Sequence, residues 1–185
     1  AAGLYAIDRA LSGPSGRRPR VVALFAANNS GALAPLALAL SQSPNTAERT
    51  VLVDANFAAP TFDAGVSGPN GFGFSDILAE RADPIDGVHQ LRSAQCHAIL
   101  AGTRSASPDP DELGRVTHEL LRAFDRVIFL AGPPTDDAIF AALTRAADQC
   151  SVIATAGETS RSTLANLAAA LRSRTPTTVA VLIAP

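Results

Sequence analysis

Three apolar segments of the sequence end at residues that could do chemistry, and each has the composition of a buried strand. They span residues 21–27, Thr50–Asp54 and 126–130. Ligands of parallel α/β proteins bind where such strands end, and the turn after the first is typical of a phosphate loop. The polar or small residues that follow the first two segments, or close them, are Asn28, Asn29, Ser30, Gly31, Asp54 and Asn56.

A phosphate site of this kind needs groups that the chain does not supply. Backbone N–H groups of a glycine-bearing turn hold the anion, a lysine contacts the terminal phosphates, and a Ser or Thr hydroxyl binds Mg²⁺. All 15 basic residues of the chain are arginines, so there is no lysine. The missing lysine is therefore a first indication that the chain has lost the phosphate chemistry that such a site performs.

The other reactive side chains do not form a recognisable site. His89, His97 and His118 are too widely spaced for a metal-ligand pattern. Cys96 stands beside His97, but no third group is identifiable that would complete a nucleophilic site. We expect Cys96 and Cys150 to be reduced thiols rather than a disulfide framework, and we expect no metal site.

Composition predicts a folded α/β protein. The chain has 185 residues, of which 47% are hydrophobic and 17% are charged, and we expect one domain over residues 1–185 that opens with a short helix and linker at 1–19. A net charge of −2 gives no electrostatic reason to bind nucleic acid. No apolar run approaches the roughly 20 residues that span a bilayer, and no signal-peptide pattern is present. We therefore expect a cytoplasmic location and no direct membrane insertion.

Strands and helices alternate along the chain. Further strands are expected over residues 97–101, 151–155 and 178–183. Helices are expected over 33–41 with Pro35 in the first turn, 76–81 with Ser75 as N-cap, 109 or 111 to about 124, 136–148, and 159–174 with Thr159 or Ser160 as N-cap. Because the strands are apolar along their whole length, they predict a parallel sheet covered on both faces. The predicted fold class is α/β, a three-layer α/β/α sandwich with a mainly parallel sheet.

Five segments, taken in order, resemble one family: the deviant Walker-A P-loop ATPases, and among them the bacterial tyrosine autokinases (BY-kinases) of capsule and exopolysaccharide biosynthesis. The resemblance implies a P-loop NTPase-like fold from about residue 20 to residue 185. Its segments are the strand, turn and helix at 20–40, VLVDANFAAP at 51–60, GFSDIL at 73–78, the pair Ala101-Gly102 with PDEL at 110–113, and FDRVIFLAGPP at 124–134.

The departures from the family pattern fall on its chemistry. The positions that the resemblance assigns to the phosphate-binding lysine, the Mg²⁺-binding hydroxyl, the second aspartate of the middle segment and the Walker-B carboxylate are, in order, Ala32, Leu33, Asn56 and Ala131. A lost charge-assisted contact costs about 1.5–3 kcal/mol. Binding of ATP and Mg²⁺ is therefore expected to be weak or absent.

The resemblance and its departures together suggest a pseudo-ATPase that acts as a regulatory or scaffold component of exopolysaccharide synthesis or export. The partner that the resemblance implies is the cytoplasmic region of a membrane-anchored polysaccharide co-polymerase, which would place the protein at the inner membrane. Two alternatives stand beside this one: an active or weakly active ATPase or tyrosine kinase of the same pathway, and a division- or partitioning-type positioning ATPase. Homo-oligomer formation is left open.

Two features allow more than one interpretation. Asp54 matches a kept aspartate of the family, which acts on the attacking group or the metal, but it could equally be a carboxylate that caps a loop or helix. The turn over residues 28–31 could cradle an anion through its amides or be an ordinary strand-to-helix turn. Phe72 and Phe74 are expected to anchor their loop in the core, with contact to a partner as the alternative.

Overall fold

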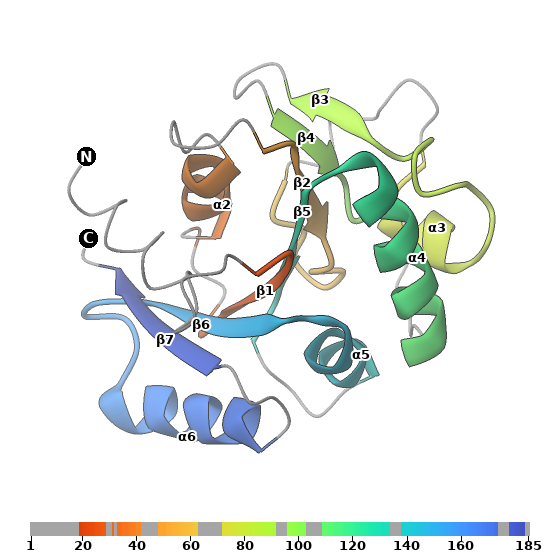
Figure 1. Cartoon of the computed structure of the whole chain (residues 1–185). Helices are drawn as coiled ribbons and strands as arrows, with labels where there is room; N and C mark the ends of the chain where they lie inside the picture. Colours follow the sequence, from red (N-terminus) through yellow and green to blue (C-terminus); the bar gives the residue numbers. More distant parts are fainter. Residues whose placement is uncertain are drawn as a thin grey trace.

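The computed structural model describes residues 19–28, 31, 33–41, 48–62, 72–91, 96–102, 109–133, 138–173 and 178–183. Its centre is a seven-stranded sheet in the order β3-β4-β2-β5-β1-β6-β7 (Figure 1). The strands are β1 (Val21–Ala26), β2 (Thr50–Asp54), β3 (His89–Leu91), β4 (Cys96–Ile99), β5 (Arg126–Ala131), β6 (Gln149–Thr155) and β7 (Thr178–Ile183).

Six of these strands are parallel, and only β3 runs antiparallel to its neighbour β4. This confirms the predicted, mainly parallel α/β sheet. The three strands at its centre, β2, β5 and β1, are buried along their whole length, as their unbroken apolar sequences indicate. Strand β3 was not predicted, since three residues are too few to give a periodic signal.

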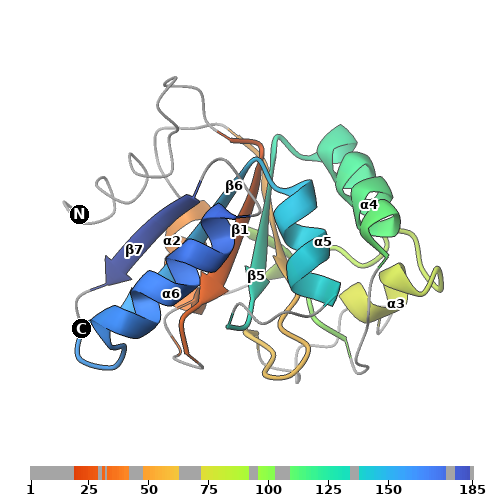
Figure 2. The same ribbon diagram turned by 90° about the horizontal axis from the view of Figure 1, so that it is seen from below.

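Helices cover both faces of the sheet (Figure 2). Helix α2 (Leu33–Ser41) packs on one face, where its buried leucines contact β1, β2 and β5. The other face carries α3 (Phe74–Leu78), α4 (Pro110–Ala123), α5 (Ala138–Ala146) and α6 (Arg161–Arg172). The arrangement is the predicted α/β/α sandwich. The predicted N-terminal helix and linker at 1–19 lie almost wholly outside the described residues.

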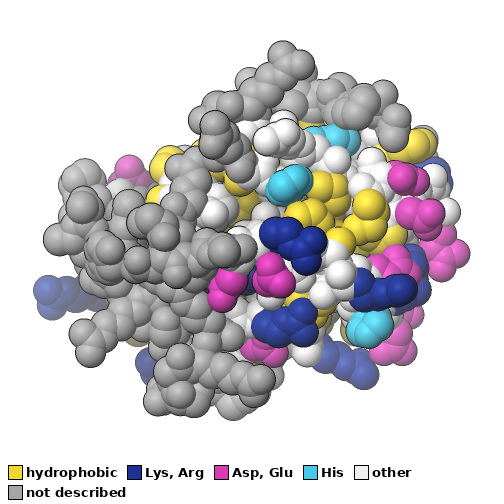
Figure 3. All heavy atoms as spheres, turned by 45° about the horizontal axis from the view of Figure 1, so that its top comes forward, with side chains coloured by type: hydrophobic (Ala, Val, Ile, Leu, Met, Phe, Trp, Pro, Cys, Tyr) yellow, Lys and Arg dark blue, Asp and Glu magenta, His cyan; other side chains and the backbone are white. Residues whose placement is uncertain are grey.

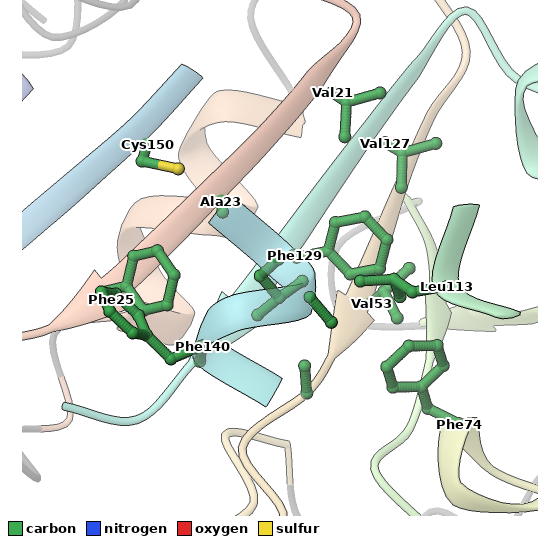
Figure 4. Close-up of a cluster of buried hydrophobic side chains, with 14 of the residues drawn as sticks. Val21, Ala23, Phe25, Val53, Phe74, Leu113, Val127, Phe129, Phe140 and Cys150 are labelled. Atoms are coloured by element: carbon green, nitrogen blue, oxygen red, sulfur yellow. The ribbon is translucent and has the colours of Figure 1, made fainter. Parts of the chain in front are cut away.

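Aromatic side chains fill the larger of the two cores, which lies between the sheet and α3–α6 (Figure 4). Phe25 of β1 meets Phe140 of α5 edge to face, with ring centroids 5.3 Å apart. Phe129 of β5 packs against Phe74 of α3, with centroids 5.9 Å apart. These fully buried rings join the central strands to α3 and α5, so the ends of β1 and β5 are held in one rigid body.

Two helix starts agree with the sequence and one does not. The Asp109 carboxylate accepts a hydrogen bond from the Asp111 N–H and caps α4, and the Ser160 hydroxyl accepts one from the Thr163 N–H at the start of α6. The prediction that Ser75 caps α3 is wrong, because α3 begins at Phe74 after the N-cap Gly73 and Ser75 is buried within it.

The start of α3 is instead fixed by the two residues that follow strand β4. The N–H groups of Phe74 and Ser75 donate to the carbonyl oxygens of Leu100 and Ala101, and the Asp76 carboxylate accepts a hydrogen bond from the Gly73 N–H. Phe74 is an anchor in the core, as predicted, but Phe72 is 37% exposed, so the same prediction is wrong for it. Its carbonyl oxygen faces His89 Nε2 at 3.4 Å.

The close packing of Gly73 on Gly102 predicts that alanine substitutions at Gly73 and at Gly114 change the stability in opposite directions. A Cβ on Gly73 would overlap the backbone of Gly102, so Gly73→Ala should lower the free energy of unfolding by more than about 2 kcal/mol. Gly114 lies in α4 with open space around its Cα, so Gly114→Ala should raise the free energy by about 0.5–1 kcal/mol. Urea denaturation of both variants checks the pair. If the two substitutions changed the free energy of unfolding by the same amount and in the same direction, Gly73 would not be in contact with Gly102.

Candidate functional site

The candidate residues gather at one edge of the sheet, where β2, β5 and β1 end side by side. Asp54, the last residue of β2, is in register with Leu130 of β5, and Ala131, the last residue of β5, is in register with Phe25 of β1. The ends of these strands are tied together, since Ala55 N–H donates to the Leu130 carbonyl oxygen. The structure therefore places Asp54 and Ala131 at the same edge. Asn29, Ser30 and Ala32 lie outside the described residues.

Asp54 is fully buried, and both oxygens of its carboxylate accept hydrogen bonds from its own loop. Oδ1 accepts from the Asn56 N–H at 3.1 Å, and Oδ2 accepts from the N–H groups of Thr61 at 2.6 Å and Phe62 at 3.0 Å. Burial raises the pKa of the Asp54 carboxyl, and the N–H groups of Phe62, Asn56 and Thr61 oppose that rise. In this geometry Asp54 is a loop-organising carboxylate, one of the two interpretations that the sequence left open.

Asn56 lies against the end of β5. A Cβ built on Gly132 would stand 2.9 Å from the Asn56 side-chain oxygen, so the amide packs on Gly132, one residue after Ala131. Ala131 itself is 2% exposed. Asn56 therefore lies beside the position that the family resemblance gives to a Walker-B carboxylate. Sequence reasoning did not foresee this contact, because no pattern within either segment signals it.

The side of this edge next to α2 is apolar. Leu33, at the position that the family resemblance gives to the Mg²⁺-binding hydroxyl, is the first residue of α2 and is 3% exposed. It belongs to the core between α2 and the sheet. Pro35 lies in the first turn, as predicted, so that turn has one N–H fewer to offer an anion. Leu33 is thus a core residue whose side chain offers no ligand.

A carboxylate that the sequence did not single out stands near the end of β1. The Asn28 amide donates to the Glu158 carboxylate at 3.5 Å, across the edge from β1 to the turn after β6. Gly157 has a φ of 84°, which its lack of a Cβ permits, and that turn carries Glu158. The contact adds negative charge at the place where a phosphate loop binds phosphate.

The segments that form this edge contain no basic residue. Between Arg20 and Arg49, between Arg49 and Arg81, between Arg126 and Arg145, and between Arg145 and Arg161 the sequence has neither lysine nor arginine. Asp54 and Glu158 are the acidic groups placed there by the contacts above. Among the described residues, no group of three or more His, Cys, Asp or Glu side chains is arranged to hold a metal ion.

Asp54→Ala tests whether this residue organises its loop. The substitution leaves three N–H groups without their acceptor in a buried place, so the free energy of unfolding should fall by about 3 kcal/mol or more. Thermal and urea unfolding measure this loss. Asp54→Asn, which keeps one acceptor oxygen, should lose less. An Asp54→Ala variant as stable as the parent would show that the carboxylate is not structural.

Comparisons with known proteins show what this fold is. No family model matches the sequence, and no curated protein matches it. Solved structures do match. The kinase domain of VpsO superposes with a TM-score of 0.80 and 16% identity, over 100% of this chain and 93% of that one. The kinase domain of the Escherichia coli tyrosine kinase ETK has a TM-score of 0.73 and 12% identity, over 89% of this chain and 68% of that one.

A related class of protein matches as well. A plasmid partition protein from Borrelia burgdorferi has a TM-score of 0.67 and 14% identity, over 90% of this chain and 79% of that one. In the part of the chain that the structure describes, no helix has the length and apolar character needed to cross a membrane. At identities this low the comparisons establish architecture, and they confirm the resemblance seen in the sequence at that level: this chain has the BY-kinase-like fold of P-loop ATPases.

Proposed function

We propose that this protein is a catalytically inactive, BY-kinase-like module that acts as a regulatory or scaffold component of exopolysaccharide synthesis or export. It works through the cytoplasmic region of a membrane-anchored polysaccharide co-polymerase and is held at the inner membrane by that partner. Fold similarity to the kinase domain of the tyrosine kinase ETK and to the kinase domain of VpsO, together with the sequence resemblance, supports the choice of pathway. The residues at the edge of the sheet support the loss of activity.

The observation that carries the proposal is the charge of that edge. Phosphoryl transfer depends on cations that neutralise the charge of the transferred phosphate, and the protein itself does little covalent chemistry. Here the segments at the ends of β1, β2 and β5 have no lysine or arginine in their sequence, and the Glu158 carboxylate lies beside Asn28. An ATP triphosphate would meet repulsion where the family provides a lysine and a metal.

The free-energy cost of the missing contacts is large enough to weaken ATP binding itself, and not only to slow phosphoryl transfer. Each missing charge-assisted contact is worth about 1.5–3 kcal/mol, and about 1.4 kcal/mol is one decade in affinity. Loss of the lysine contact and the hydroxyl ligand therefore removes about two to four decades. Asp54 does not offset this, since its oxygens already accept three backbone hydrogen bonds.

Calorimetric titration with ATP and MgCl₂ tests the proposal. We expect no saturable heat up to millimolar nucleotide, because the segments that follow β1, β2 and β5 contain no lysine or arginine to hold a triphosphate. Clear saturable binding would contradict the inactive assignment and favour the alternative, an ATPase or tyrosine kinase of the same pathway. It would also be the result expected of a positioning ATPase, which the similarity to a plasmid partition protein keeps as a second candidate.

A single restored lysine should not restore the reaction. In Ala32→Lys the cation returns, but Leu33 is buried in the core and the end of β5 is occupied by Asn56 and Ala131, so no metal ligand returns with it. We expect no ATP hydrolysis and no tyrosine phosphorylation above the parent level in a phosphate-release and a radiolabel assay. Turnover by this variant would mean that the lysine was the only group lost.

A further inference from the structure

A hollow in the surface is formed by residues of the turn at 80–88, which follows α3, and by one residue of α4. It is largely open to solvent, has a volume of about 550 Å³ and is lined by Glu80, Arg81, Ala82, Asp83, Asp86 and Arg115. Figure 3 shows the corresponding side of the molecule, where acidic and basic side chains gather at the right of the view. Nothing in the proposed loss of nucleotide chemistry accounts for this hollow.

The two arginines of the hollow are already paired. The Arg81 guanidinium donates to the Asp76 carboxylate at 2.7 Å, and the Arg115 guanidinium bridges Glu112 at 2.6 Å and Glu119 at 2.8 Å. These pairs satisfy the positive groups from within the protein. They leave no free cation in the hollow to hold an incoming anion.

Unlike the two arginines, the three acidic side chains of the hollow have no ion-pair partner within the described part of the chain. Glu80, Asp83 and Asp86 are exposed, and within the described part of the chain their carboxylates have no hydrogen bond or ion pair. Asp83 and Asp86 are held in a fixed turn, since the Asp86 N–H donates to the Asp83 carbonyl oxygen at 3.0 Å. The hollow therefore presents unpaired negative charge in a set geometry.

An apolar side chain projects from the same turn. Ile85 lies between the two aspartates in sequence and is 49% exposed, and with Phe72 it is one of two large hydrophobic residues exposed in the described part of the chain. Pro84 and Gly87 on either side are buried, so the turn is anchored while Ile85 faces solvent. Burial of Ile85 by a partner would remove apolar surface from water at little cost in ordering the turn.

We propose that this hollow, with Ile85 at its border, is the docking surface for a basic peptide segment of a partner protein, in which Lys or Arg side chains flank an apolar one. The cations would pair with Glu80, Asp83 and Asp86, and the apolar side chain would cover Ile85. Charge complementarity selects this occupant, because the hollow has unpaired carboxylates and no unpaired cation.

The cytoplasmic segments of a membrane-anchored partner that lie next to the membrane fit this description. Cytoplasmic residues next to a membrane span carry an excess of Lys and Arg. This identification rests on the proposed function, whereas the docking surface itself does not. None of the residues that line the hollow belongs to the candidate site at the ends of β1, β2 and β5, so occupancy of one does not require occupancy of the other.

Fluorescence anisotropy tests the proposal with a short labelled peptide of lysines and arginines around a central pair of leucines. We expect saturable binding that weakens as salt is raised, since exposed ion pairs are screened. The triple variant Glu80→Gln, Asp83→Asn, Asp86→Asn should lose about tenfold or more in affinity, and Ile85→Ser about threefold. A peptide in which glutamates replace the basic residues should not bind.

A matched control separates this site from general attraction to an acidic protein. Asp86→Asn and Asp111→Asn each remove one exposed carboxylate, but Asp111 lies at the start of α4 and faces Arg145 of α5. Only Asp86→Asn should weaken binding. Equal losses of peptide affinity in Asp86→Asn and Asp111→Asn would overturn the proposal. So would an unchanged affinity in the triple variant, provided that its circular dichroism spectrum matches that of the parent. Saturable ATP binding would instead overturn the inactive assignment and leave the peptide result standing.

Discussion

The structure depends on three adjacent strands that are buried on both faces. Each of β2, β5 and β1 is buried along its whole length, and the unpaired polar groups of such strands must lie at their ends. Any chemistry of the protein is therefore confined to loops at the sheet edge, and those loops sit on a rigid frame. In folds of this kind the edge is where ligands bind, and whether a ligand binds there depends on a few side chains.

The apolar packing that positions the strand ends does not depend on the side chains that would bind a ligand there. Apolar packing around Phe25, Phe74 and Phe129 maintains the positions of the strand ends whether or not a nucleotide is bound. Asp54 contributes to the same frame, because its carboxylate closes the loop that runs on to Thr61 and Phe62. A residue that the family uses in catalysis can thus persist for a structural reason.

Much of this architecture could be predicted from the sequence. Unbroken apolar runs locate β1, β2 and β5, and Asp109 and Ser160 mark two helix starts by a local rule of capping. The segment at α3 departed from prediction because its start is decided by distant backbone. Gly73 packs on Gly102 and the first N–H groups of the helix bond to the end of β4, and neither contact has a signal in the local sequence.

The candidate site shows the same division. Its candidate positions follow from the strand ends, but the packing of Asn56 on Gly132 and the approach of Glu158 to Asn28 join segments more than 70 residues apart in sequence. These contacts change the meaning of the absent lysine. A lone missing cation could be supplied from elsewhere, as arginines are by partner proteins in phosphoryl transfer. On the proposed function, a supplied cation would not restore the reaction here, because Leu33 is buried at the metal position and Asn56 packs against the end of β5, so no metal ligand would come with the cation.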